Sequence, residues 1–199
     1  MPAQTETSVS CVKDNVWVFG YGSLIWKPNF KYEKVLPGSI EGVSRKFWQG
    51  SRDHRGTDEK PGRVATLVED PQGKVCGLGF ELSPEEAEAT FNYLDDRETG
   101  YKLKQVIFYP CDPSQSIQKV LVYTATESNP DFLGPSPLTE MADCIATCEG
   151  HSGPNSEYLF NLAHMMRLLF PACVDEELFL LEEEVKRIKN GYIKKNEKR

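Results

Sequence analysis

The chain has 199 residues, which is enough for one domain that buries a hydrophobic core of its own. Hydrophobic residues make up 39% of it and aromatic residues 11%, as in folded globular proteins rather than disordered ones. The formal net charge of −7, from 30 Asp and Glu against 23 Lys and Arg, argues against nucleic-acid binding, which needs a basic surface.

Nothing in the sequence indicates a membrane protein or a secreted one. No run approaches the roughly 20 apolar residues that a membrane-spanning helix needs, and the start, MPAQTETSVS, lacks the basic and apolar regions of a secretory signal. The six cysteines form no Cys-x-x-Cys pair, so we interpret them as reduced thiols of a cytoplasmic protein. Cys144 and Cys148 are four residues apart, but no histidine has a matching spacing, and we predict no metal site.

Strands dominate the first two thirds of the chain. Residues 1–14 are polar without a periodic pattern, which predicts a disordered lead-in. Residues 15–20 form a short apolar run that ends in glycine and is expected to be a buried strand. Further strands are predicted from runs rich in Val, Phe, Tyr and Leu, at residues 39–49, 63–69, 74–82, 101–109 and 119–125. Residues 50–62 are polar and predict a long loop, typical of functional or mobile segments.

Four helices are predicted from capping residues and apolar stripes of helical period. They cover residues 83–96, 136–148, 155–171 and 175–191, with Gly191 as the end of the fourth. Because most strands precede most helices, we predict a compact α+β domain over residues 15–190, a small barrel of mixed strands flanked by about four helices. Residues 191–199 are expected to form a basic C-terminal tail.

The end of the first predicted strand carries a candidate anion-binding turn. Two glycines flank a tyrosine in Gly20-Tyr21-Gly22-Ser23-Leu24. Glycine permits backbone angles that turn N–H groups outward, where they can bind an anion or a developing oxyanion. A plain tight turn is the alternative, and the pattern alone leaves both open.

Two other segments invite a functional interpretation. Asp95, Asp96 and Glu98 lie at the C-terminal end of the first predicted helix, where acidic residues face the unfavourable negative end of the helix dipole. A general base aimed into a pocket would explain them, and a solvated acidic turn paired with Arg97 is the alternative. Tyr158 lies in the first turn of the third predicted helix, where it can orient a ligand or simply pack beside the cap.

These segments occur in a fixed order together with several others. The set comprises residues 17–26, 45–51, 53–56, 61–64, 93–95, 97–98, 106–110 and 129–134. Through them the chain resembles the ChaC-type γ-glutamylcyclotransferases over residues 16–188. It departs from that family at residues 96–100, which read Asp-Arg-Glu-Thr-Gly. Many members have an aromatic residue before the arginine and a second glycine after the glutamate.

The resemblance implies a γ-glutamylcyclotransferase-like fold and a glutathione-specific activity. Reduced glutathione, a small-molecule partner, would be converted to 5-oxoproline and L-cysteinylglycine without a cofactor. The family's catalytic glutamate falls on Glu98, and Tyr158 matches a family tyrosine near the third helix. Its substrate-holding loop falls on Gly20, Tyr21, Gly22, Ser23, Leu24 and Ile25.

The leaving-group end of glutathione needs local positive charge in an acidic protein. We expect Arg52, Arg55 and Arg63, in or beside the loop at 50–62, to include the residues that contact its carboxylate. Two other functions stay open: a cyclotransferase for other γ-glutamyl amino acids or amines, and a non-catalytic binding or regulatory protein on the same scaffold. A monomer is expected, because no unusually apolar exposed stripe stands out.

Overall fold

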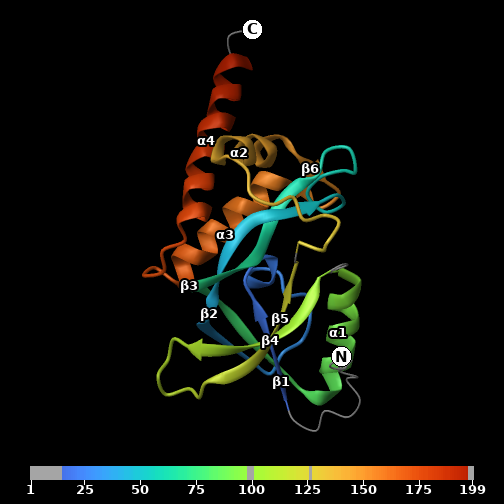
Figure 1. Cartoon of the computed structure of the whole chain (residues 1–199), viewed down its shortest axis with the longest axis vertical. Helices are drawn as coiled ribbons and strands as arrows, with labels where there is room; N and C mark the ends of the chain where they lie inside the picture. The colour runs from blue at the N-terminus through green and yellow to red at the C-terminus, as the bar shows by residue number, and fades with distance from the viewer. Residues whose placement is uncertain (1–14, 98–100, 126, 197–199) are drawn as a thin grey trace.

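The computed structural model, which describes residues 15–97, 101–125 and 127–196, is a five-stranded barrel with three helices gathered beyond one end (Figure 1). The strands are β1 (Val16–Gly20), β2 (Lys34–Ser51), β3 (Gly62–Leu82), β4 (Lys102–Pro110) and β5 (Gln118–Thr124). The helices are α1 (Pro84–Arg97), α2 (Leu138–Thr147), α3 (Asn155–Leu169) and α4 (Glu176–Asn196), with a short 3-10 helix, η1 (Ser23–Ile25). A two-stranded hairpin, β6 (Glu149–Gly150) and β7 (Gly153–Pro154), precedes α3.

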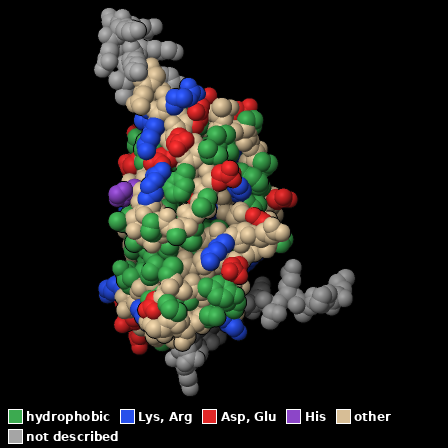
Figure 2. Space-filling model, turned by 90° about the vertical axis from the view of Figure 1, so that its left-hand side faces the viewer, with side chains coloured by type: hydrophobic (Ala, Val, Ile, Leu, Met, Phe, Trp, Pro, Cys, Tyr) green, Lys and Arg blue, Asp and Glu red, His purple; other side chains and the backbone are tan. Residues whose placement is uncertain are grey.

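The barrel is closed in the order β1-β3-β2-β4-β5. Its closing pair, β1 with β5, is parallel, and the other neighbours are antiparallel. This confirms the predicted α+β domain with a small barrel of mixed strands and four flanking helices. Among the described helices, none is long and apolar enough to cross a membrane. On the face shown in Figure 2, acidic, basic and hydrophobic side chains are interspersed.

Two phenylalanines fill the barrel, and glycines make room for them. Phe19 of β1 and Phe108 of β4 lie with their ring centroids 5.7 Å apart. A Cβ added at Gly38 would lie 2.3 Å from the Phe108 ring, and one at Gly77 would lie 2.6 Å from the Phe19 ring. Large rings opposite missing side chains are how a narrow barrel reaches close packing.

The β2–β3 hairpin is longer than predicted. The predicted strands at 63–69 and 74–82 are one strand, β3, and β2 begins at Lys34 rather than at residue 39. Residues 70–73, Asp-Pro-Gln-Gly, have the composition of a turn, but they form an irregularity within β3, where the register shifts between Glu41 and Val43. Gly42 sits at that shift with φ +80°, a conformation that glycine adopts without strain.

The far half of this hairpin carries the helices. Arg45 of β2 is buried, forms an ion pair with Asp175 just before α4, and donates a hydrogen bond to the Cys76 carbonyl of β3 (2.6 Å). The backbone N–H of Phe47 donates to the Glu177 carboxylate at the start of α4 (2.8 Å). Charged side chains therefore tie α4 to the hairpin across a low-dielectric contact, where such bonds are strong.

The predicted end of the fourth helix is wrong, because α4 continues through Gly191 to Asn196. A glycine ends a helix by taking a left-handed conformation, and Gly191 has none. Residues 191–196 of the predicted tail are thus helical. The predicted disorder of residues 1–14 concerns a segment outside the described residues.

Replacing Gly191 by alanine tests this helix end. Inside a helix, Gly191→Ala is expected to raise the free energy of unfolding by about 0.5–1 kcal/mol, because alanine loses less backbone entropy on folding, and a Cβ there meets nothing within 4 Å. Urea denaturation measures the change. Gly134→Ala is the matched control and should destabilise, because Gly134 has φ +67°. A loss of stability in Gly191→Ala would mean that the glycine does end the helix.

Candidate active site

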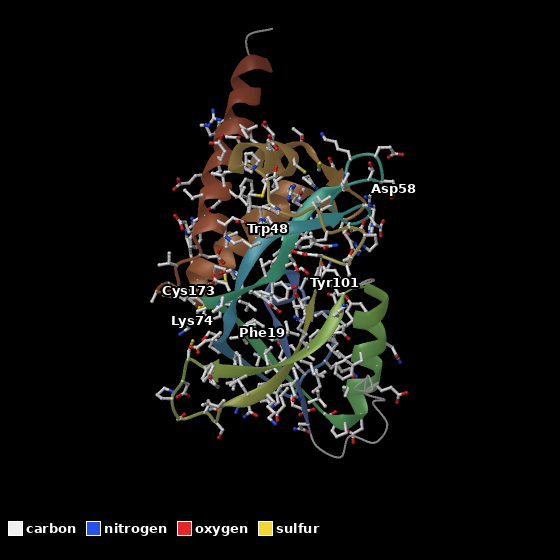
Figure 3. All side chains as sticks on the ribbon, viewed as in Figure 1. Phe19, Trp48, Asp58, Lys74, Tyr101 and Cys173 are labelled. Atoms are coloured by element: carbon white, nitrogen blue, oxygen red, sulfur yellow. The ribbon has the colours of Figure 1, made fainter. Side chains whose placement is uncertain are left out.

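A cavity of about 690 Å³ lies where the barrel meets the helices. This volume suits a small-molecule ligand. Its described lining includes Tyr21, Gly22, Ser23, Leu24, Gln49, Arg52, Arg55, Tyr93, Tyr101, Tyr123 and Tyr158. Figure 3 shows Tyr101, which precedes β4, at the level where barrel and helices meet. The predicted turn, the predicted loop and two of the predicted arginines, Arg52 and Arg55, therefore share one cavity with Tyr158.

The predicted turn forms one wall, together with η1. The Tyr21 hydroxyl donates to the Tyr123 carbonyl at the end of β5 (2.8 Å), which anchors the turn on the barrel. Gly22 faces Tyr158 so closely that an added Cβ would lie 2.7 Å from the Tyr158 hydroxyl oxygen. That oxygen accepts a hydrogen bond from the backbone N–H of Ala65 on β3 (3.3 Å). Turn, sheet and α3 thus meet at a single tyrosine hydroxyl.

A buried asparagine places this tyrosine. Asn155, the first residue of α3, is completely buried. Its side-chain carbonyl accepts the Arg63 N–H (2.7 Å), and its side-chain NH₂ donates to the Arg63 carbonyl (2.8 Å). The amide therefore satisfies both backbone groups of one residue of β3, as a neighbouring strand would. Tyr158 follows about one helical turn later, beside Ala65 of the same strand.

Residues 52–55, at the start of the loop between β2 and β3, also line the cavity. Arg52 is half-exposed and paired with Asp131, and this hydrogen bond raises the pKa of Arg52. The Arg55 guanidinium is largely buried, with its Nη2 atom 3.3 Å from a Glu157 carboxylate oxygen on α3. Both arginines line the cavity, and each is already held by a carboxylate.

Three other predicted site residues lie behind the cavity wall rather than in its described lining. Arg63 donates to the carbonyls of Phe47 and Gly134, both at 3.0 Å, and its burial lowers its pKa. Gly20 ends β1, where a Cβ would lie 2.8 Å from Leu24, and Ile25 is buried in the core. Direct contacts from these residues to a ligand stay predictions.

Glu98, the predicted catalytic residue, lies outside the described residues. Its neighbours along the chain are informative, because Tyr93 and Leu94 before it and Tyr101 after it all line the cavity. Its role stays a prediction.

Sequence reasoning missed several lining residues. Gln49 is 3% exposed, and its side-chain oxygen has no hydrogen-bond partner among the described residues. The sequence signal available was its place between an aromatic residue and Gly50 at the end of a strand. His54 is not among the predicted site residues, yet it lines the cavity, and its ring centroid lies 4.7 Å from that of His151. Contacts between residues so far apart in the chain leave no local pattern to detect.

The contact between Gly22 and Tyr158 is testable by a double-mutant cycle. Gly22→Ala is expected to destabilise the protein by about 1–3 kcal/mol, because the new methyl group overlaps the tyrosine hydroxyl. Tyr158→Phe removes that oxygen, so the double variant should lose less than the sum of the single losses, as measured by urea denaturation. Strict additivity of the two changes would contradict the proposed contact.

The comparisons with known proteins agree on one family. A family model described as ChaC-like protein matches residues 16–188. A glutathione-specific γ-glutamylcyclotransferase 1 of Danio rerio is 45% identical over 173 residues, covering 85% of this chain and 88% of the relative. A glutathione-specific γ-glutamylcyclotransferase of Schizosaccharomyces pombe is 40% identical over 189 residues, covering 87% and 93%. A crystal structure of a γ-glutamyl cyclotransferase specific to glutathione from yeast is 32% identical, with a TM-score of 0.78, and covers 88% of this chain and 100% of that one. The chain therefore belongs to the ChaC-like family.

Proposed function

We propose that the protein is a glutathione-specific γ-glutamylcyclotransferase, which converts reduced glutathione to 5-oxoproline and L-cysteinylglycine. Family membership and the activity named for its relatives support the reaction and the substrate. The cavity is the observation that carries the proposal for this chain. It has the volume for a tripeptide, and its lining includes the turn at 21–24 and two arginines.

The reaction rearranges bonds within one substrate molecule. A bond forms between the α-amine nitrogen and the γ-carbonyl carbon, and the bond from that carbon to the cysteine nitrogen breaks, with no water consumed. Since nucleophile and electrophile are tethered, the protein has only to fold the γ-glutamyl arm into a reactive geometry, which can lower the barrier by several kcal/mol. No cofactor is proposed.

Glu98 is proposed as the group that moves the proton. The ammonium must lose a proton before it attacks, and the departing nitrogen must gain one. A carboxylate between the two nitrogens can take the first proton and deliver it to the second. The lining residues that flank Glu98 in the sequence, Tyr93, Leu94 and Tyr101, support its assignment to this cavity.

The turn at Tyr21–Leu24 is proposed to stabilise the carbonyl oxygen as it becomes negative. The turn and the start of η1 at Ser23 lie on the cavity wall, and backbone N–H groups of such a turn can face a developing oxyanion. Donors fixed in place before the reaction cost no reorganisation, and one such donor is worth about 10²–10³-fold in rate. Because Gly22 has no side chain, the Tyr158 hydroxyl can lie directly beside the turn.

Gln49 is proposed to bind the α-ammonium group of the substrate. Its side-chain oxygen is buried, lines the cavity and lacks a partner among the described residues. An unpaired buried acceptor costs about 1–3 kcal/mol, and an N–H donor of the substrate would remove that cost. The assignment places the amine near the end of β2.

Glu98→Gln tests the base. The substitution keeps the side chain's shape and removes its basicity, so kcat is expected to fall by about 10²–10⁴-fold with little change in KM. The assay incubates purified protein with reduced glutathione and follows 5-oxoproline and cysteinylglycine by mass spectrometry. Glu88→Gln, at an exposed position of α1, is the matched control and should retain full turnover.

The outcomes separate the alternatives. Full turnover in Glu98→Gln would discard the base and keep the reaction. Turnover of γ-glutamyl-alanine but not of glutathione by the wild type would favour a cyclotransferase for other γ-glutamyl compounds. Glutathione binding without product would favour a binding protein.

Arg52 is the arginine we propose to contact the glycine carboxylate of glutathione. Arg52→Gln is expected to lower kcat/KM for glutathione by about tenfold, because a charge-assisted hydrogen bond is lost. A γ-glutamyl amide whose leaving group has no carboxylate should be converted at the wild-type rate. Arg187→Gln on α4 makes the same charge change far along the chain and should affect neither substrate. Equal losses on both substrates in Arg52→Gln would refute the contact.

We also propose a cytoplasmic location. The described cysteines, Cys76, Cys111, Cys144, Cys148 and Cys173, are all free thiols, as a reducing compartment favours. The monomeric state stays a prediction.

A further inference from the structure

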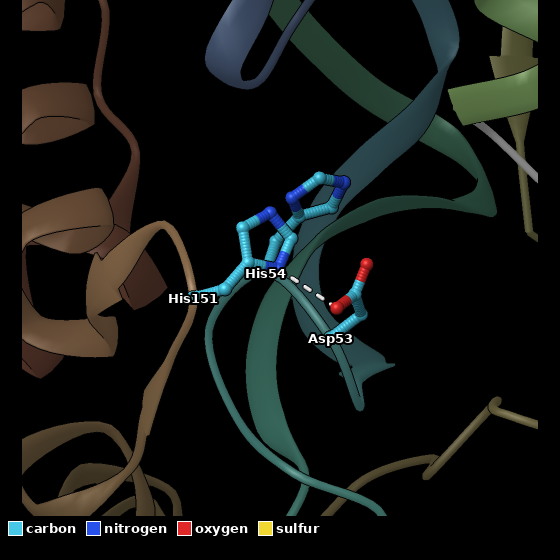
Figure 4. Close-up of side chains that lie close together, drawn as sticks. All are labelled: Asp53, His54 and His151. Carbon is cyan, nitrogen blue, oxygen red and sulfur yellow. Dashed lines mark hydrogen bonds and ion pairs between the residues drawn. The ribbon is translucent and has the colours of Figure 1, made fainter.

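Three side chains with metal-binding chemistry meet on the cavity wall (Figure 4). The potential ligand atoms of Asp53, His54 and His151 all lie within 4.8 Å of one another. His151 Nδ1 is 2.7 Å from a carboxylate oxygen of Asp53. All three residues are exposed and line the cavity. The cluster is therefore accessible both to solvent and to whatever the cavity holds.

The backbone, and not a chance meeting of side chains, brings the cluster together. The His151 N–H donates to the Asp53 carbonyl (3.0 Å), and the Ser152 N–H donates to the His54 carbonyl (3.1 Å). Gly150 makes this docking possible, because a Cβ there would lie 2.3 Å from the Asp53 carbonyl oxygen. The turn after β6 and the loop after β2 are thus locked edge to edge, which holds the donor groups near one another before any ion binds.

One histidine also has the support that metal ligands usually have. In metal sites, one imidazole nitrogen binds the ion and the other is oriented by a hydrogen bond. The Ser152 hydroxyl lies 3.0 Å from His54 Nδ1, so it can orient the ring and assign Nε2 as the ligand nitrogen. Ser152 belongs to the same turn as His151. The turn after β6 therefore supplies both a ligand, His151, and the hydroxyl group that can orient His54.

The neighbouring cations do not neutralise the carboxylate of the cluster. Arg52 is paired with Asp131, and Arg55 is paired with Glu157. Asp53 itself is paired with His151. A cation bound at the cluster would replace the direct contact between Asp53 and His151.

We propose that Asp53, His54 and His151 bind a divalent transition-metal cation of the zinc type. Two imidazole nitrogens and one carboxylate oxygen are the donors that zinc and its first-row neighbours prefer, whereas calcium and magnesium select oxygen donors. Ligand atoms around tetrahedral zinc lie roughly 3.3 Å apart, a spacing that exposed side chains reach by small rotations. Three protein ligands leave the fourth position for water or for an anionic group in the cavity.

Direct zinc binding tests the site without relying on activity. Protein free of glutathione, kept reduced with a reductant that is not a thiol, is titrated with zinc chloride in a calorimeter. We expect one zinc ion per chain in the wild type, and affinities lower by about tenfold or more in His54→Ala, His151→Ala and Asp53→Asn. His164→Ala removes an exposed imidazole on α3 and should bind as the wild type does.

The cysteines are the rival ligands and need their own control. The Cys144 and Cys148 sulfurs lie 3.6 Å apart, but burial raises the pKa of the Cys144 thiol to about 12, which disfavours the thiolate that a metal needs. The double variant with Cys144→Ser and Cys148→Ser should bind zinc with the affinity of the wild type. Cobalt(II) bound in place of zinc should show the comparatively intense visible d–d bands of a four-coordinate site, without a thiolate charge-transfer band.

Three results would overturn the proposal. They are a wild type that binds no zinc, unchanged affinity in both histidine variants, and an affinity that falls with the cysteines instead. Thermal melting of each metal-free variant shows that it is folded, so that lost binding reports the site itself.

Discussion

The long antiparallel pairing of β2 with β3 is the constraint on which the rest of the structure depends. The strands have 18 and 21 residues, longer than the barrel needs, so one half closes the barrel with β1 and β4 and the other half carries α3 and α4. Since register is set along the whole length of a strand pair, the barrel and the helices cannot slide independently. The cavity lies between the turn after β1 and the loop at the far end of this hairpin, so its width is fixed by the same pairing.

The start of α3 transmits this constraint to the cavity. Asn155 satisfies the backbone N–H and carbonyl of Arg63, and each would cost about 1–3 kcal/mol if it were buried without a partner. The helix can therefore begin in only one position against β3. Tyr158 follows from that position, because its hydroxyl meets both Ala65 and the space left by Gly22. A residue that looks functional is thus placed by a neighbour whose role is structural, and the glycine opposite it has to stay small.

The strands and helices could largely be predicted from local pattern, because compact apolar runs and capping residues act over a few positions. The errors have the same origin. Residues 70–73 have the composition of a turn, yet they lie within β3, where the residues on both sides of them pair with β2. Gly191 is a residue type that often ends helices, but it lacks the left-handed backbone angle. The resemblance to a family predicted Gly22 and Tyr158, which do meet. It could not separate Arg55 from Arg63, because both are buried to the same extent and only the fold shows that Arg55 lines the cavity. Nor could it find His151, whose partner Asp53 lies about 100 residues away.

The two cavity arginines differ in what a ligand must displace. The side chains of Arg52 and Asp131 are 39% and 34% exposed, and ion pairs in such positions contribute about 0–1 kcal/mol. A substrate carboxylate can therefore take the place of Asp131 at little cost. The Arg55 side chain is only 11% exposed, and it also donates to the Pro154 carbonyl just before α3 (3.0 Å), so freeing it would unpair a buried charge and loosen the start of that helix. Of the two cavity arginines, Arg52 is therefore the one whose carboxylate partner an anionic ligand can replace easily.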